Sequence, residues 1–527
     1  MPVSGLVAAM IPIIDVFAGP GGLGEGFTAL GQPESAPRFR IRLSIEKDFF
    51  AHRTLVFRTF FRQFHPSEVP AEYYALLRGE IQYEAISAKF PAQAARAEAE
   101  AWQGELGKTP WNEVSERICA ALGGAKNWVL IGGPPCQPYS QMGRSRLKAK
   151  KTYRLETDER HGLYRAYLHI IAGHWPAVFV MENVKGFLSS ALREQSMFEP
   201  ILEDLEDPVK ALGNEHPATF KRRQTYKICS LVSRGIFGEA RPEDFVVKAE
   251  VLGVPQARHR VIILGIRDDL GKVFPGLLAK KNPVPAKEVL VGMPPLRSGL
   301  SGTEDHPDAW VACLKEALNR RWLAGARRVA GEKVYRLLVE TLGSIKEPSF
   351  GRGGEFVRCE PSVQYLPEWF LDPKLEGVCN HRTRLHMLTD LHRYLYAACF
   401  ARVHGFSPTL SSFPPDLLPD HRSVAKALEN GGFFDDRFRV QVYDRPATTV
   451  TSHMAKDGHY YIHPDPFQCR SLTVREAARL QTFPDNYFFF GPRTAQYTQV
   501  GNAVPPLMAK AIAERVWELL KCAGVGE

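Results

Sequence analysis

The chain has 527 residues, of which 44% are hydrophobic and 24% charged, and its net charge at pH 7 is +9. This is the composition of a globular protein long enough for two or more domains, and no stretch approaches the roughly 18 uninterrupted apolar residues that a membrane span requires. The nine cysteines occur singly, without a C-x-x-C pair. This argues against a zinc site or a disulfide framework and favours a reducing, cytoplasmic setting. The positive charge suggests a polyanionic partner.

The first predicted strand, residues 11–17, follows an apolar start without Lys or Arg, which argues against a signal peptide. Glycines 19, 21 and 24 then form a G-x-G-x-x-G loop, where a ligand can approach the backbone. The next predicted strand, 41–45, ends at Glu46, where a carboxylate can bind ribose hydroxyls, and Phe17 is placed to meet an adenine face. The pattern suits a dinucleotide or another adenosine-bearing cofactor, and a glycine-rich turn without a ligand is the alternative.

Residues 51–127 are helical in character, and the Ala- and Glu-rich stretch 90–105 is predicted to be a solvated helix. Within this region a short strand end is predicted at residues 76–81. It would turn Glu80 toward the cofactor.

Residues 132–140 read Gly-Gly-Pro-Pro-Cys-Gln-Pro-Tyr-Ser and follow the apolar run 128–131, a predicted buried strand. They hold one thiol, Cys136, at the carboxyl end of a strand, where open α/β folds place their chemistry. The thiol is either a nucleophile or an inert small residue in a turn. Residues 144–154 then carry six positive charges and no acid. This run is either a solvated loop or, beside a nucleophile, a lid that follows phosphates.

Polar residues also follow the next predicted strand, 177–181, which a helix at 163–173 precedes. A carboxylate at this strand end, Glu182, suits a functional site, and a helix-capping acid is the alternative. Two further predicted strands, 246–252 and 260–265, bracket a turn that carries Arg258 and Arg260. A spacing of two puts both arginines on one face of an extended segment, suited to phosphate or carboxylate contacts, unless they are surface arginines of no consequence.

Six motifs occur in one fixed order, and together they resemble the DNA (cytosine-5)-methyltransferase family over residues 13–515. They are Phe17-Ala-Gly-Pro-Gly-Gly, Gly132-Gly-Pro-Pro-Cys-Gln, Glu182-Asn-Val, Gln256-Ala-Arg-His-Arg260, Arg445-Pro-Ala-Thr-Thr449 and Gln499-Val-Gly-Asn-Ala-Val-Pro-Pro. The Pro-Cys-Gln and Glu-Asn-Val segments are the specific ones. The resemblance implies an α/β fold, in which a Rossmann-like sheet binds S-adenosylmethionine and a second, smaller domain recognises the target.

The resemblance implies that residues 1–270 form the first part of the catalytic domain and 271–444 the target-recognition domain. Residues 445–527 would be a hinge motif and a carboxyl-terminal segment that returns to the catalytic domain. Between 271 and 444 the pattern of buried strands stops, and basic residues there either read guanine edges or lie on ordinary helix surfaces such as 386–403. Residues 476–481 are predicted to be a surface helix.

The activity that the resemblance implies is methyl transfer from S-adenosylmethionine to carbon 5 of a cytosine in a specific duplex DNA sequence. A thiolate that adds to carbon 6 makes carbon 5 nucleophilic, and Cys136 would supply it. Glu182 would hold N3 and the exocyclic amine, and Arg258 would lie nearer the base or its phosphate than Arg260. Because the target atom is buried in a duplex, the base must flip out.

The remaining site residues follow from residue-to-residue matching and from the basic run. Cofactor contacts are expected at Phe17, Gly19, Pro20, Gly22, Glu46, Glu80, Pro135, Leu163, Asn502 and Val504. DNA contacts are expected at Ser140, Arg144, Arg146, Lys148 and Arg260. No metal is expected.

The resemblance implies duplex DNA as the partner, S-adenosyl-L-homocysteine as the product, and a monomer in the prokaryotic cytoplasm, associated with the nucleoid. A restriction endonuclease that acts separately would accompany it. An RNA (transfer RNA) methyltransferase of the same fold and an inactive DNA-binding relative remain open. The large region after Arg267 favours a DNA reader, and intact Cys136, Glu182 and Arg258 speak against an inactive relative. A nicotinamide oxidoreductase, allowed by the glycine loop alone, is excluded by the sequence after residue 130.

Overall fold

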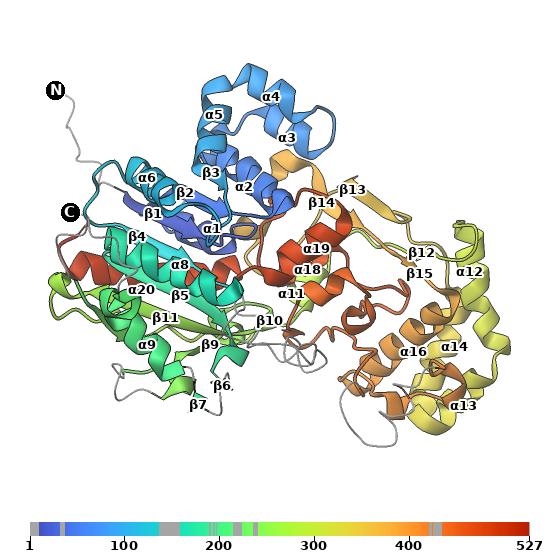
Figure 1. The fold of residues 1–527 in the computed structure, drawn as a ribbon. Coiled ribbons are helices and arrows are strands. Elements are labelled where there is room, and N and C mark those ends of the chain that lie inside the picture. Colours follow the sequence, from blue (N-terminus) through green and yellow to red (C-terminus); the bar gives the residue numbers. More distant parts are fainter. Residues whose placement is uncertain are drawn as a thin grey trace.

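A computed structural model of the chain describes residues 10–31, 37–135, 159–188, 191–192, 195–196, 198–213, 224–234, 241–420, 424 and 435–525. An eight-stranded sheet organises its first half (Figure 1), with the order β3-β2-β1-β4-β5-β11-β8 and β9 beside β11. The strands are β1 (Ile11–Val16), β2 (Phe39–Glu46), β3 (Ala101–Gln103), β4 (Val129–Gly132), β5 (Val178–Val184), β8 (Tyr226–Cys229), β9 (Val246–Lys248) and β11 (His259–Arg267). β1 to β5 run parallel, whereas β11 runs antiparallel to β5, β8 and β9.

Both faces of this sheet are covered, which explains why its central strands read as continuous apolar runs. On β1, Ile11 and Ile13 join the core under α1 (Gly22–Thr28) and α20 (Pro506–Cys522), whereas Ile14 and Val16 join the core of the opposite face. That second face is covered by α6 (Trp111–Leu122), α8 (Glu159–His174), α9 (Phe198–Glu206) and α10 (Pro208–Leu212). The expected α/β fold is therefore confirmed.

The predicted strand end at residues 76–81 is wrong. This part of the chain forms helices: α2 (Phe49–Phe61), α3 (Ala71–Leu77), α4 (Tyr83–Lys89) and α5 (Pro91–Glu100). The third parallel strand, β3, lies instead inside the stretch 90–105 predicted to be a solvated helix, where Ala94 and Ala97 are buried. A three-residue edge strand after an Ala-rich helix has no apolar run of its own, so periodicity does not reveal it.

Helices dominate the region from residue 300 to 410, at the right of Figure 1. α12 (Pro307–Glu316), α13 (Arg321–Ala330), α14 (Glu332–Ser344) and α16 (Leu388–His404) surround one hydrophobic core. The core also contains Ile462 and Cys469. The helix expected within 386–403 is present as α16, but it is buried along most of its length, so it does not offer an ordinary helix surface for the basic residues of this region.

Short strands connect this helical core to the sheet. β12 (Gly299–Leu300) pairs with β15 (Leu385–His386), and β13 (Gly353–Arg358) pairs with β14 (Gly377–Arg382). β10 (Gln256–Ala257) pairs with β16 (Ala447–Thr448), so the arginine turn and the Arg445 motif lie side by side. Among the helices that the structure describes, none has the length and apolar character needed to cross a membrane.

The predicted surface helix at 476–481 is also corrected, because α18 (Val474–Leu480) is fully buried. Two of its three charges are paired inside the protein: Arg479 forms two hydrogen bonds with Asp485, at 2.9 and 2.6 Å, and Glu476 accepts two from Arg470. α19 (Arg493–Asn502) and α20 follow. α20 packs closely on α1, since a Cβ atom at Gly26 would lie 2.3 Å from the carbonyl oxygen of Pro506.

Candidate active site

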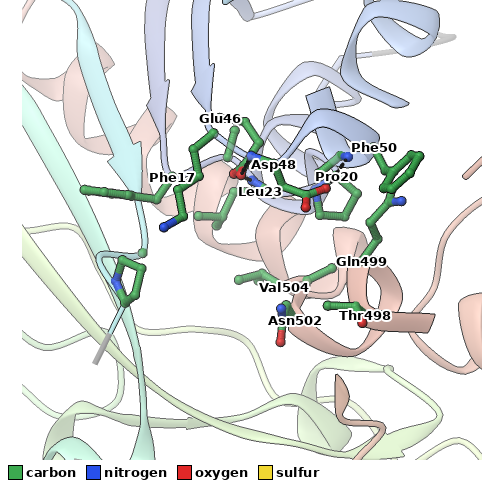
Figure 2. A pocket seen from close by; sticks show the side chains of 18 of the residues that line it. Phe17, Pro20, Leu23, Glu46, Asp48, Phe50, Thr498, Gln499, Asn502 and Val504 are labelled. Carbon is green, nitrogen blue, oxygen red and sulfur yellow. Dashed lines mark hydrogen bonds between the residues drawn. The ribbon is translucent and has the colours of Figure 1, made fainter. Parts of the chain in front are cut away.

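A cavity of about 780 Å³ opens at the carboxyl ends of β1, β2 and β4 (Figure 2). This is the edge where parallel α/β sheets bind their ligands, and the volume is in the range of small-molecule sites. Nine of the ten predicted cofactor residues line it, together with Glu182. The nine are Phe17, Gly19, Pro20, Gly22, Glu46, Pro135, Leu163, Asn502 and Val504.

The glycine loop shapes one wall of the cavity. Gly19 and Gly21 have positive φ angles of 57° and 91°, which side chains other than glycine rarely adopt. Gly22 begins α1 against the chain that enters α20: a Cβ atom there would lie 2.2 Å from the carbonyl oxygen of Val504. The close approach of these two backbones brings Asn502 and Val504 into the same cavity as the loop.

Glu46, at the end of β2, holds the loop from the other side. Its Oε2 accepts a hydrogen bond of 2.8 Å from the backbone N–H of Gly19, and its Oε1 accepts one of 2.8 Å from Asp48. Burial raises the pKa of Glu46, and these backbone donors oppose the rise. A carboxylate fixed in this way at a cavity wall can accept hydrogen bonds from the two hydroxyls of a ribose.

Apolar surface completes this part of the cavity. Phe17 has a φ of 54°, in the left-handed region that is uncommon for a residue with a side chain. Its ring lies on one side of the cavity in Figure 2, with Phe50 on the other. Leu163, from α8, also lines the cavity. The acceptor at Glu46, the apolar surfaces and the close glycine loop together fit an adenosine-bearing cofactor.

Glu182 stands at the end of β5, where the cavity meets the chain that leads to Cys136. It forms an ion pair with Arg260, with 2.7 Å between Oε1 and Nε, and the two side chains are only 13% and 11% exposed. A Cβ atom at Gly133 would lie 2.6 Å from Glu182 Oε2. The carboxylate therefore lies directly against the Gly-Gly-Pro-Pro segment. Burial lowers the pKa of Arg260, and the charge of Glu182 opposes this shift.

Arg258 does not lie at the position expected from the sequence, beside the base or its phosphate. It is fully buried and donates hydrogen bonds to three backbone carbonyls, those of Val450 (2.6 Å), Gly501 (3.0 Å) and Ala503 (2.8 Å). The expectation that Arg258 is nearer the base than Arg260 is corrected, since Arg260 is the residue beside the Glu182 carboxylate. Arg258 lies between β10, which pairs with β16, and β11, which belongs to the large sheet, so the two arginines face different partners.

Glu80 is the predicted cofactor residue that does not line the cavity. It is exposed and forms ion pairs with Arg78 and Arg358, at 2.7 and 3.3 Å. The expected cofactor contact of Glu80 is therefore corrected. Because the third parallel strand is β3, the residues that follow it, Gly104 and Leu106, line the cavity instead.

Other lining residues were also missed. They are Ala18, Leu23, Ile45, Lys47, Asp48, Phe50, Ala51, Gly133, Val184, Pro492, Thr494, Ala495, Thr498, Gln499 and Ala503. Asp48 carried a sequence signal, because it precedes a helix and caps it: its carboxylate accepts a hydrogen bond of 2.9 Å from Ala51 N–H. The predicted nucleophile Cys136 and the predicted DNA contacts Ser140, Arg144, Arg146 and Lys148 lie outside the described residues, which end at Pro135 on this side.

Comparisons with known proteins agree with this geometry. The family model described as C-5 cytosine-specific DNA methylase matches residues 107–208 and 419–518. The chain is 30% identical over 529 residues to the type II methyltransferase M.Bpa9945I of Bacillus paralicheniformis, covering 96% of this chain and 99% of that protein. It is 25% identical to the type II methyltransferase M.DdeI of Desulfomicrobium norvegicum, covering 96% and 88%. With the DNA (cytosine-5-)-methyltransferase M.ApeKI of Aeropyrum pernix the identity is 27%, covering 77% and 85%.

The first of these similarities extends along nearly the whole of both chains. The family model covers the part of the cavity lining that lies between Gly133 and Val184 and between Pro492 and Val504. The chain therefore belongs to the C-5 cytosine-specific DNA methylase family and is a DNA (cytosine-5)-methyltransferase.

Proposed function

We propose that this enzyme transfers the methyl group of S-adenosylmethionine to carbon 5 of a cytosine within a specific duplex DNA sequence, through a covalent adduct between Cys136 and carbon 6. The observation that carries the proposal is that Glu182, which Arg260 pairs with, and Pro135, the residue before Cys136, line the same cavity as the glycine loop. A methyl donor in the cavity and a cytosine beside Glu182 would then be neighbours.

The cofactor would be held by this chain's own polar and apolar groups. Glu46 would accept hydrogen bonds from the ribose hydroxyls, and Phe17 and Leu163 would contact the adenine. Asn502 and Val504 would bind from the end of α19 and the link to α20. When bound, S-adenosylmethionine supplies an electrophilic methyl group on a sulfonium. The residues around it orient that group and exclude water.

The chemistry at the cytosine needs a nucleophile and a proton partner. The Cys136 thiolate would add to carbon 6, and the new C–S bond forms as the C5=C6 electrons shift toward carbon 5. Carbon 5 would then take the methyl group as the bond from that methyl to the sulfonium sulfur breaks, which leaves S-adenosyl-L-homocysteine. Glu182 would hold N3 and the exocyclic amine and exchange the proton that offsets charge on the ring. Arg260 would fix the orientation of that carboxylate. Loss of the carbon 5 proton then restores C5=C6 and releases the thiolate.

The cytosine must leave the duplex to reach this site, because carbon 5 and carbon 6 are stacked within it. We infer that Ser140, Arg144, Arg146 and Lys148 grip the DNA around the flipped nucleotide. We also infer that residues 271–444 recognise the target, while 1–270 and 445–527 form the catalytic domain. The α1–α20 contact supports this division, because it returns the end of the chain to the sheet.

Several relatives are named type II methyltransferases. We infer from this that the enzyme is the modification half of a bacterial restriction-modification system, with an endonuclease acting separately, and that it works as a cytoplasmic monomer on nucleoid DNA. We propose no metal for these steps.

The test is methyl transfer from labelled S-adenosylmethionine to plasmid DNA or to total transfer RNA, followed by base-resolution mapping of 5-methylcytosine. We expect label in DNA only, at one short sequence, with no transfer by Cys136→Ala. Cys119→Ala is the matched control, because Cys119 is an exposed free cysteine on α6. Label confined to RNA would overturn the DNA assignment. Label in neither substrate would favour an inactive DNA-binding relative.

A further inference from the structure

A second hollow, a groove of about 430 Å³, lies between the short strands β13 to β15 and the first turn of α19. Its lining residues are Arg352, Glu355, Arg382, Leu385, Pro492 and Arg493, which we call the arginine groove. Pro492 also lines the cofactor cavity, so the two hollows adjoin. Nothing in the proposed chemistry uses these arginines.

Two of the three guanidinium groups, those of Arg352 and Arg493, lie close together because they share one hydrogen-bond acceptor. Arg493 donates a hydrogen bond of 2.6 Å to the carbonyl oxygen of Thr383, and Arg352 donates one of 3.4 Å to the same oxygen. Arg352 is also bound to Asp305, at 2.6 Å. Burial lowers the pKa of Arg493, and the nearby charges of the groove arginines lower it further. Three guanidinium groups meet two carboxylates here, those of Glu355 and Asp305, and Asp305 also pairs with Arg297. The excess charge at the groove is therefore positive, and an anion would neutralise it.

The helix that begins at the groove increases this potential. Arg493 is the first residue of the ten-residue helix α19, whose first turn carries no acidic residue. The amino end of a helix carries a partial positive charge, so an arginine there is electrostatically unfavourable unless an anion is near.

The groove arginines are not all occupied by partners among the described residues, so a cation remains available to an anionic ligand. The Glu355 carboxylate accepts hydrogen bonds from two neutral amides, those of Asn380 (3.2 Å) and Gln496 (2.9 Å), rather than from the arginines. Arg382 is exposed, and its guanidinium forms no hydrogen bond or ion pair with any residue in the described ranges. Leu385, which is 47% exposed, adds apolar surface beside these charges.

We propose that the arginine groove binds a backbone phosphate of the DNA substrate, with Arg382 as its free cation and Leu385 against the adjoining deoxyribose. This inference rests on the proposed function, because it requires a DNA substrate. A groove open to solvent suits a phosphodiester within a DNA strand, because the strand continues on both sides of the bound phosphate. It also adjoins the wall of the cofactor cavity at Pro492, and so connects residues of the recognition region to the catalytic half.

The test compares DNA affinity across salt concentrations for wild type, Arg382→Ala, Arg382→Lys and the control Lys521→Ala. Lys521 is an exposed cation at the end of α20, outside both hollows. Each phosphate contact makes the logarithm of the DNA-binding constant fall about 0.9 more steeply with the logarithm of the salt concentration. The slope for Arg382→Ala should therefore be shallower than that of wild type by about 0.9. Between about 50 and 200 mM salt its affinity should then fall about 3.5-fold less than that of wild type. Arg382→Lys and Lys521→Ala should keep the wild-type slope.

The outcomes separate this inference from the proposed function. If wild type methylates DNA but Arg382→Ala keeps the full salt slope, the groove does not bind the backbone, whereas the proposed function stands. If wild type transfers no methyl group to DNA, the proposed function itself fails. If Arg382→Ala weakens the binding of inorganic phosphate alone and leaves DNA affinity unchanged, the groove holds a small anion and our proposal is refuted.

Discussion

Replacing Gly22 with alanine tests the contact that forms one wall of the cofactor cavity. A Cβ atom at this position would lie 2.2 Å from the carbonyl oxygen of Val504, and real Cβ atoms essentially never approach a heavy atom closer than 3.0 Å. The glycine loop and the segment before α20 must therefore separate by about 0.8 Å. Because a misplacement of about 1 Å in a binding site can cost about 100-fold in rate, we expect kcat/KM to fall by about that factor.

The assay combines calorimetric binding of S-adenosylmethionine with methyl transfer and urea denaturation. Overpacking should also lower the free energy of unfolding by about 1–3 kcal/mol. Gly343→Ala on α14 is the control, because a Cβ atom there has no neighbour within 4 Å, and it should leave cofactor binding unchanged. If Gly22→Ala remained folded and bound the cofactor with wild-type affinity, this cavity would not be the cofactor site.

Three further substitutions test the active site and the buried charges. Glu182→Gln removes the carboxylate charge, and we expect kcat to fall by about 10²- to 10⁴-fold; wild-type kcat in a single-turnover assay would refute its role. Asp485→Asn leaves the buried charge of Arg479 unpaired and should lower the free energy of unfolding by about 3–5 kcal/mol in urea, whereas an unchanged midpoint would contradict this. Burial alone would raise the pKa of Glu476, but Arg470 holds it well below its usual range. The stability that this charge contributes is therefore present above the unfolded pKa of about 4.3 and is lost as the pH falls further. The difference in unfolding free energy between wild type and Glu476→Gln should narrow below that pH, and a constant difference down to pH 3 would argue against this linkage.

Much of the catalytic half could be predicted because its physical signals are local. The apolar runs of β1, β2, β4 and β5 each end at a glycine or an acid, and parallel strands bring those ends to one edge. This is why Phe17, Glu46 and Glu182 meet at one cavity. Placing β3 failed because three residues at a sheet edge carry no periodic pattern, and Glu80 was misplaced with it.

The two arginines and the helix α18 show a different limit. A spacing of two can place two side chains on one face, but it does not say which groups each will contact: Arg258 binds three backbone carbonyls, whereas Arg260 pairs with Glu182. Whether a charged helix is exposed or buried depends on the groups that the fold brings against it, and the spacing of residues in the sequence does not show those groups. Arg475 is buried because it donates to three backbone carbonyls, those of Cys379, Pro484 and Tyr487. The periodicity of the sequence cannot predict that backbone carbonyls will satisfy a buried arginine in this way.

The most direct test of the account is covalent trapping on duplex DNA that carries 5-fluorocytosine at the mapped target. Fluorine at carbon 5 cannot leave as a proton does, so the adduct persists after methyl transfer. We expect mass spectrometry to find the peptide containing Cys136 joined to a methylated fluorocytosine, only when S-adenosylmethionine is present. An adduct on another residue, or efficient methylation of ordinary DNA by Cys136→Ala, would contradict the proposed mechanism.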